Sequence, residues 1–244
     1  MVKGLLIVAL LTLACTARAA PAISIGDMHE FVESSARTLL KRVSNSGTST
    51  AFVRIEVKEI VYEAGKPIER DMPPMTLRQG STQAGLIASP ARLIIPVNSA
   101  QTTRLLTLGP RDVERYYRVR FVPVMPQQGE DFALTTEQRT AYADSLSAGL
   151  TLLTGFGAIV VVRPEAERYD TRIADEADAF RLLNAGNSTI ALTAIRDCNA
   201  SGQQCSAESV RRVLPGSSAT IEKTPGRVYS ATLVEGTDTK TVTF

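Results

Sequence analysis

The stretch from residue 145 to residue 164 constrains the fold most, because an alternating apolar row passes there into a continuous apolar run. A period of two places alternate side chains on one face of a β-strand. The second half, residues 156–162, is rich in β-branched residues and is typical of a buried strand. Pro164 ends the strand, because proline cannot donate a hydrogen bond into a sheet. The alternating row consists of Leu146, Ala148, Leu150 and Leu152. Such a row fits either ordinary sandwich core or an apolar ridge that a strand offers to a partner.

The first nineteen residues have the pattern of a secretory signal peptide. Lys3 gives the positive start, residues 4–14 form the apolar segment, and Ala17 and Ala19 form a small-residue cleavage site. The apolar segment is too short to cross a bilayer. Cys15 hints at a lipoprotein box, but the residues before it match that box poorly. We therefore expect cleavage after Ala19 and export of the mature chain.

The charge balance argues against a polyanionic partner. Residues 1–19 hold Lys3 and Arg18 and no acidic side chain, so without them the 27 basic residues fall to 25, equal to the 25 acidic ones. A neutral chain lacks the basic surface that nucleic acid or an anionic membrane attracts. We expect neither as a partner.

Strand-like segments recur along the rest of the chain at spacings typical of β-sandwiches. Residues 38–44 and 50–62 are predicted to form a hairpin-like pair, and residues 116–124 alternate clearly. A polar insertion at 127–139 is predicted to be a loop with a helical turn near 135–142. Further strands are expected at 180–183, 188–196, 210–214, 218–222 and 228–234, whereas the acidic stretch from 165 to 178 reads as a solvated linker. The fold class is therefore all-β, with two sandwich domains at 20–163 and 164–244.

Two cysteines remain after signal cleavage, Cys198 and Cys205. In an oxidising compartment this pair is expected to form a disulfide. A metal site would need more ligands, and the one histidine, His29, is far away in sequence. A hydrolase would need a base beside a nucleophile, and no Gly-x-Ser-x-Gly elbow or phosphate-binding loop is present. We expect no catalytic residues, no cofactor and no metal.

In this order, the segments resemble the periplasmic chaperones of chaperone–usher pili, and specifically the alternate branch that serves class-5 fimbriae and the common pilus. The resemblance covers nearly all of the mature chain. The matching segments are 39–46, 88–97 with Thr103-Arg104 after it, 114–121, 159–164, 182–187 and the Cys198/Cys205 loop. The resemblance implies two immunoglobulin-like domains set at an angle, with a subunit-binding cleft between them.

The resemblance also implies a function for the alternating row. In this family a pilin lacks its last strand, and the chaperone lends its own strand to fill the groove. Leu146, Ala148, Leu150 and Leu152 would be the pilin-binding side chains. The implied partners are pilin subunits, the tip adhesin and an outer-membrane usher. Because an exposed apolar strand tends to aggregate, we expect the free chaperone to cap it by self-association.

A basic anchor for the carboxylate at the pilin's C-terminus is the second implied element. Lys41 shares a face with Leu39 and Val43, and by alignment with the family it takes the place of the cleft cation. A carboxylate would satisfy it with a charge-assisted hydrogen bond. The alternative is that Lys41 only extends along a strand edge to solvent. Arg42, on the opposite face, and Arg118, on the strand beside the donor strand, are the other candidates.

A second function class stays open at this stage. A secreted immunoglobulin-like pilus subunit or adhesin would also be all-β and exported. Such a subunit would be expected to carry a donor extension near its own N-terminus, and residues 20–32 are a poor donor.

Overall fold

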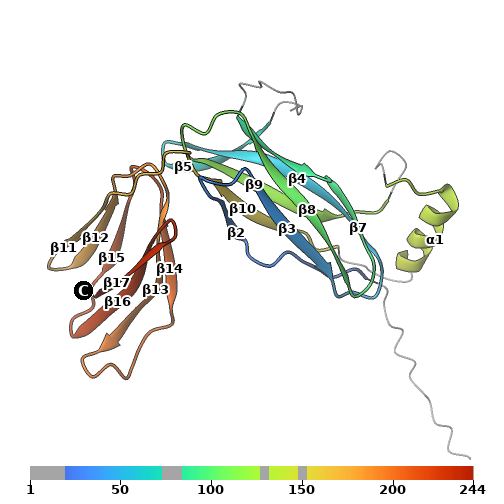
Figure 1. The fold of residues 1–244 in the computed structure, drawn as a ribbon. Helices are drawn as coiled ribbons and strands as arrows, with labels where there is room; N and C mark the ends of the chain where they lie inside the picture. The colour runs from blue at the N-terminus through green and yellow to red at the C-terminus, as the bar shows by residue number, and fades with distance from the viewer. Residues whose placement is uncertain (1–19, 73–83, 127–131, 148–152, 244) are drawn as a thin grey trace, which may run out of the picture.

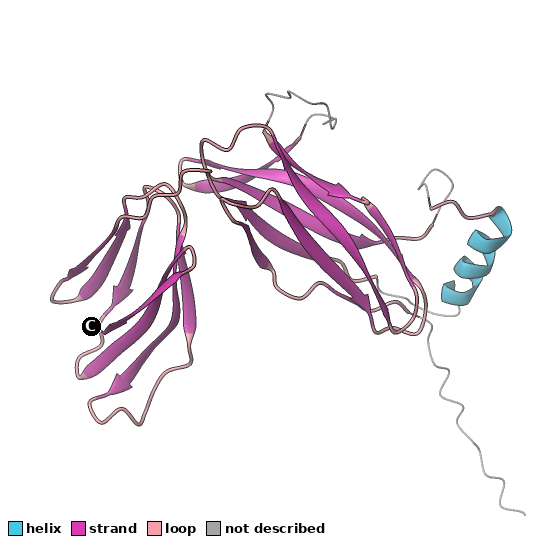
Figure 2. Ribbon diagram, in the orientation of Figure 1, coloured by secondary structure: helices cyan, strands magenta, loops and turns pink. Residues whose placement is uncertain are grey.

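The computed structural model describes residues 20–72, 84–126, 132–147 and 153–243. Their strands form two β-sandwiches set at an angle, with α1 at the end of the N-terminal sandwich that lies away from the C-terminal one (Figures 1 and 2). The N-terminal sandwich comprises β1 (Ile23–Ser24), β2 (His29–Val32), β3 (Thr38–Asn45), β4 (Ala51–Glu63), β5 (Lys66–Asp71), β6 (Gly85–Ser89), β7 (Arg92–Ile95), β8 (Ser99–Leu108), β9 (Arg115–Pro123), α1 (Thr136–Ser147) and β10 (Phe156–Val162). The C-terminal sandwich comprises β11 (Thr171–Asp175), β12 (Ala179–Asn184), β13 (Ile190–Asn199), β14 (Ser209–Val213), β15 (Ser218–Glu222), β16 (Arg227–Glu235) and β17 (Asp238–Thr243).

In the N-terminal sandwich, one sheet has the order β1-β3-β8-β6 and the other the order β2-β10-β9-β4-β5, with β7 also on β4. Tyr117, Val119 and Phe121 of β9 all point into the core between the sheets, as their alternation predicts. The hairpin-like pairing of 38–44 with 50–62 is wrong. β3 pairs with β1 and β8, whereas β4 pairs with β5, β7 and β9. The short connection between β3 and β4 crosses from one sheet to the other, so Val43 and Val53 meet in the same core.

The C-terminal sandwich packs a three-stranded sheet, β11-β12-β15, on a four-stranded one, β14-β13-β16-β17. Its core is a separate cluster that includes Leu182, Ile190 and Leu192. The strands expected from 180 onward are confirmed, and β11 is an addition within the stretch interpreted as a linker. β11 pairs on one side only, with β12, and most of its side chains are partly or fully exposed. An edge strand of this kind tolerates charged residues, so β11 lacks the apolar pattern from which the other strands were predicted.

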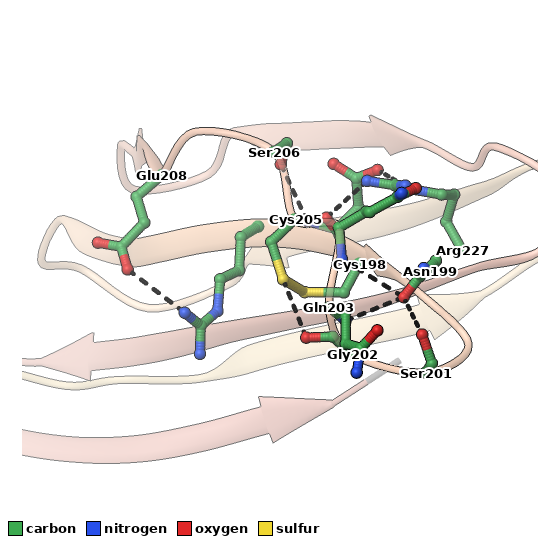
Figure 3. Close-up of a disulfide and its surroundings, with 12 residues drawn as sticks. Cys198, Asn199, Ser201, Gly202, Gln203, Cys205, Ser206, Glu208 and Arg227 are labelled. Carbon is green, nitrogen blue, oxygen red and sulfur yellow. Dashed lines mark hydrogen bonds and ion pairs between the residues drawn. A yellow bond between two sulfur atoms is a disulfide. The ribbon is translucent and has the colours of Figure 1, made fainter.

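The predicted disulfide is present and joins Cys198 with Cys205. Cys198 lies near the end of β13, and Cys205 lies in the loop that leads toward β14 (Figure 3). Asn199 supports the same loop, since its side-chain oxygen accepts hydrogen bonds from Ser201 at 2.9 Å and from the amide of Gln203 at 3.0 Å. The bond therefore closes a short, hydrogen-bonded turn at the tip of the C-terminal sandwich.

The segment 145–164 is not one continuous strand. Residues up to Ser147 belong to α1, so Leu146 is helical, and β10 begins only at Phe156. Thr135 and Gln138 explain the helix start, because the Gln138 amide donates to the Thr135 hydroxyl at 3.2 Å and the Gln138 side chain accepts from the Thr135 amide at 2.9 Å. The helical turn predicted near 135–142 is confirmed and continues further. No helix among the described residues is long and apolar enough to span a membrane.

Candidate functional site

Part of the edge of β10 is open. β2 runs parallel to β10 but pairs only with Ile159–Val162. The amide of Ile159 donates to the carbonyl of Met28 at 2.7 Å, so odd-numbered amides of β10 point toward β2. The amide and carbonyl of Gly157 point the same way, but there the described residues supply no partner strand. Such an edge is a template for another strand.

The alternating apolar row at 146–152 lies next to this edge in sequence. Of its four residues only Leu146 is described, and it is 6% exposed on α1. Ala148, Leu150 and Leu152 lie outside the described residues, so their role stays a prediction.

Lys41 points into the N-terminal sandwich, on the same face as Val43, as the alternation of β3 predicts. It is 3% exposed. Its ammonium donates to the carbonyl of Asp27 at 2.5 Å and forms an ion pair with Glu30. The side chain therefore does not reach out to solvent. It closes the edge where the chain passes from β1 to β2, beside a surface pocket of about 380 Å³ that Arg42 also lines.

Arg118 lies on the outer face of the sheet, directly beside β10. Its stem crosses Gly157, where an added Cβ would lie 3.3 Å from Arg118 Cδ. Its Nε is 3.3 Å from a carboxylate oxygen of Glu69. Arg120 shares that carboxylate at 2.6 Å, so one acid faces two arginines. Burial raises the pKa of Glu69, but hydrogen bonds and charge from Arg120 and Arg118 outweigh it and the pKa lies below its usual value.

Two further basic groups, which the sequence did not reveal, converge on the same region. His29 of β2 and Arg118 of β9 both pair with Ile159 of β10, so they lie in one row across the sheet. Burial lowers the pKa of His29, and the charges of Arg212 and Arg118 lower it further. Arg212 belongs to β14 of the C-terminal sandwich. Arginines from both sandwiches thus lower the pKa of one histidine. No local pattern in the sequence predicts that these three residues lie close together.

Polar contacts join the two sandwiches. The carboxylate of Glu114 accepts hydrogen bonds from the Thr189 amide at 2.8 Å and from the Tyr116 hydroxyl at 2.6 Å. Burial raises the Glu114 pKa, although these hydrogen bonds oppose the rise. Arg163 donates to the Tyr169 hydroxyl at 2.7 Å and to the carbonyl of Thr189 at 3.3 Å. The relative placement of the two sandwiches therefore rests on specific side chains.

Arg111 ties the end of β10 to the chain that follows β2. Its guanidinium is buried and donates to the carbonyls of Arg163 at 2.9 Å and 2.5 Å, of Glu33 at 2.8 Å and of Ala36 at 2.5 Å. These carbonyls belong to the chain just after β2 and to the chain just after β10. Arg111 therefore holds the ends of these two strands together.

A pocket of about 540 Å³ lies at the junction between the two sandwiches. Tyr62, Val113 and Tyr116 line it from the N-terminal sandwich, and Asn187 and Leu214 from the C-terminal one. Among the described residues no group of three or more histidine, cysteine, aspartate or glutamate side chains is placed to hold a metal ion. The pocket has aromatic and apolar walls and suits a polypeptide segment or another apolar ligand.

Comparison with known proteins gives consistent relatives. The chain is 30% identical over 210 residues to the probable fimbrial chaperone EcpB of Escherichia coli O157:H7, covering 84% of this chain and 83% of that protein. It is 30% identical over 191 residues to EcpB of Escherichia coli K12, covering 76% and 75%. No protein-family model matches the chain.

Solved structures share the fold. The class 5 fimbriae chaperone CfaA aligns with a TM-score of 0.54 at 18% identity, over 91% of this chain and 98% of CfaA. The Escherichia coli chaperone DraB gives a TM-score of 0.54 at 14% identity, over 92% and 98%. A chaperone–tip subunit pre-assembly complex from the archaic Csu pili of Acinetobacter baumannii, CsuC–CsuE, gives a TM-score of 0.51 at 12% identity, over 92% and 98%.

Proposed function

Because this chain belongs to the fimbrial chaperone family, we propose that it holds pilus subunits in the periplasm by lending them a strand. The observation that carries the mechanism is the open edge of β10 at Phe156–Ala158, which follows the apolar row. A subunit strand would pair with this edge through main-chain hydrogen bonds, and Leu146, Ala148, Leu150 and Leu152 would fill its groove. Three leucines at about 1.5–3 kcal/mol each would contribute roughly 4.5–9 kcal/mol.

The proposed partners are pilin subunits and the tip adhesin, in keeping with the chaperone–tip subunit complex among the structures of this fold. Delivery to an outer-membrane usher, where another subunit replaces the lent strand, completes the proposed cycle. Residues 1–19 act as the signal peptide in this scheme. Self-association of the free chain would cover the exposed edge.

For the carboxylate of the pilin we propose a basic anchor drawn from Lys41, Arg42 and Arg118. Arg118 is favoured because it lies beside β10 and faces a region to which Arg212 adds a second positive charge. A carboxylate at Lys41 would have to displace Glu30 from its ion pair. Arg42 is exposed on β3 and has the least supporting geometry.

Co-purification from the periplasm tests strand lending. The chain is expressed with a pilin from the same organism, as wild type and as a Leu150→Asp, Leu152→Asp double variant. An Ile68→Asp, Val228→Asp variant is the matched control, because both side chains are already exposed on other strands. We expect wild type and control to recover soluble pilin and the double variant to recover none. If a folded double variant recovered as much soluble pilin as wild type, the proposed mechanism would be wrong.

A further inference from the structure

Helix α1 covers an apolar spot on the outside of the N-terminal sandwich. Phe52 lies on the outward face of β4, yet it is only 6% exposed. Two rings from the segment between β9 and β10 lie edge-on to it. The centroid distance to Phe52 is 5.3 Å for Phe132 and 4.8 Å for Tyr142. Figure 1 shows α1 at the end of the sandwich, away from the C-terminal sandwich.

The helix is attached through one narrow strip. The Tyr142 hydroxyl donates to the carbonyl of Thr50 at 2.7 Å, at the start of β4. Leu146 follows four residues later, so it lies on the same side of the helix, and it is buried whereas Tyr142 is half-buried. The remaining described side chains of α1 are exposed or half-buried.

The helix itself is short. It has 12 residues, a length at which an isolated helix is marginal in water. Its sequence includes threonine, serine and aspartate, which are weak helix formers. The cap made by Thr135 and Gln138 fixes its start, whereas Tyr142 and Leu146 lie in its last two turns.

We propose that α1 is a latch that competes with strand lending: while Tyr142 and Leu146 are docked, Leu146 cannot join the extended row. The inference rests on the proposed function. The backbone of Leu146 cannot be helical and extended at the same time, because a helix rises about 1.5 Å per residue and a strand about 3.3 Å. A subunit that uses Leu146 must first undock the last turn of α1. The apparent association constant therefore equals the intrinsic one multiplied by the fraction of chains that are undocked.

Variants that shift the latch in opposite directions test the proposal. Tyr142→Ala removes the docking ring, and Tyr142→Phe removes only the hydrogen bond to Thr50. Thr140→Ala is the matched opposite, because Thr140 is exposed and alanine strengthens the helix without touching the docked face. The probe is a major fimbrial subunit from the same organism, with its own N-terminal extension deleted, titrated against the mature full chain. We expect Tyr142→Ala to bind at least about threefold tighter, Tyr142→Phe to fall between it and wild type, and Thr140→Ala to bind about twofold weaker.

Amide hydrogen exchange at positions 137–147 supplies the second readout. In the free chain we expect faster exchange in Tyr142→Ala, and in the wild-type complex we expect the helical protection of these amides to be lost. The latch is overturned if Tyr142→Ala exchanges faster but binds no tighter, or if the complex retains the helix. If Tyr142→Ala fails to fold, Tyr142→Phe and Thr140→Ala decide the same question.

The two proposals fail in different ways. If wild type and all variants bind the subunit equally, strand lending stands and only the latch is lost. If none of them binds the subunit, strand lending fails and the latch fails with it.

Discussion

Replacing Lys41 by methionine tests whether this residue holds the N-terminal sandwich together. Methionine keeps the length of the side chain but removes the ammonium that bonds Glu30 and the carbonyl of Asp27. Removing one partner of a buried ion pair costs about 3–5 kcal/mol, because the other charge is left without compensation. The side chain of Glu30 is 23% exposed, so water offsets part of this loss and we expect about 3 kcal/mol.

Urea unfolding measures this loss directly. With a slope of roughly 2–3 kcal/mol per molar, a loss of 3 kcal/mol moves the midpoint down by about 1 M. Adding Glu30→Gln to Lys41→Met removes the stranded charge, and we expect a coupling energy of at least about 1.5 kcal/mol between the two changes. Lys41→Glu is unsuitable for a binding test, since it sets two carboxylates against each other in a buried place.

One outcome would contradict the expected loss of stability, and another would decide whether Lys41 belongs to the anchor. A Lys41→Met midpoint equal to that of wild type would mean that the ion pair adds no stability. A folded Lys41→Met, Glu30→Gln variant that binds pilin as tightly as wild type would remove Lys41 from the anchor and leave Arg118 as the first candidate.

Three further predictions concern the rest of the chain. Cys198→Ser, Cys205→Ser should keep its circular dichroism spectrum but lose about 2.5 kcal/mol of unfolding free energy, the value for a loop closed across seven residues; an unchanged stability would contradict it. Arg111→Met should cost about 3 kcal/mol or more in urea unfolding, because several buried carbonyls lose a charged donor; a loss under about 1 kcal/mol would be too small for this role. The one histidine, His29, should titrate below 6.5 by NMR. Because the folded chain binds this proton less well than the unfolded chain, its contribution to stability is complete above pH 6.5 and declines as the pH falls; His29→Gln should lose that part of the pH dependence in thermal melts.

Alternation and apolar runs predicted the strands well where one face or both are buried. Tyr117, Val119 and Phe121 show this on β9, and β10 begins and ends where its apolar run does. Pairing was harder, because alternation tells which face is buried but not which sheet a strand joins. This is why residues 38–44 and 50–62 were matched wrongly.

The site was only partly visible in the sequence. Leu146 fits a period of two with the residues after it and a period of four with Tyr142 before it, and the docked ring of Tyr142 decides for the helix in the free chain. The inward face of Lys41 was predictable, but its partner Glu30 was not, because the fold alone brings β2 against β3. Arg212 approaches His29 only through the angle between the sandwiches.

A subunit strand on the open edge of β10 would protect the amides that point toward that edge. Amide hydrogen exchange at Gly157 is therefore compared between the free chain and its complex with the pilin. We expect fast exchange in the free chain and strong protection in the complex, with little change at Ile159, which already donates to Met28. A tight complex in which Gly157 still exchanges as in the free chain would rule out pairing at this edge.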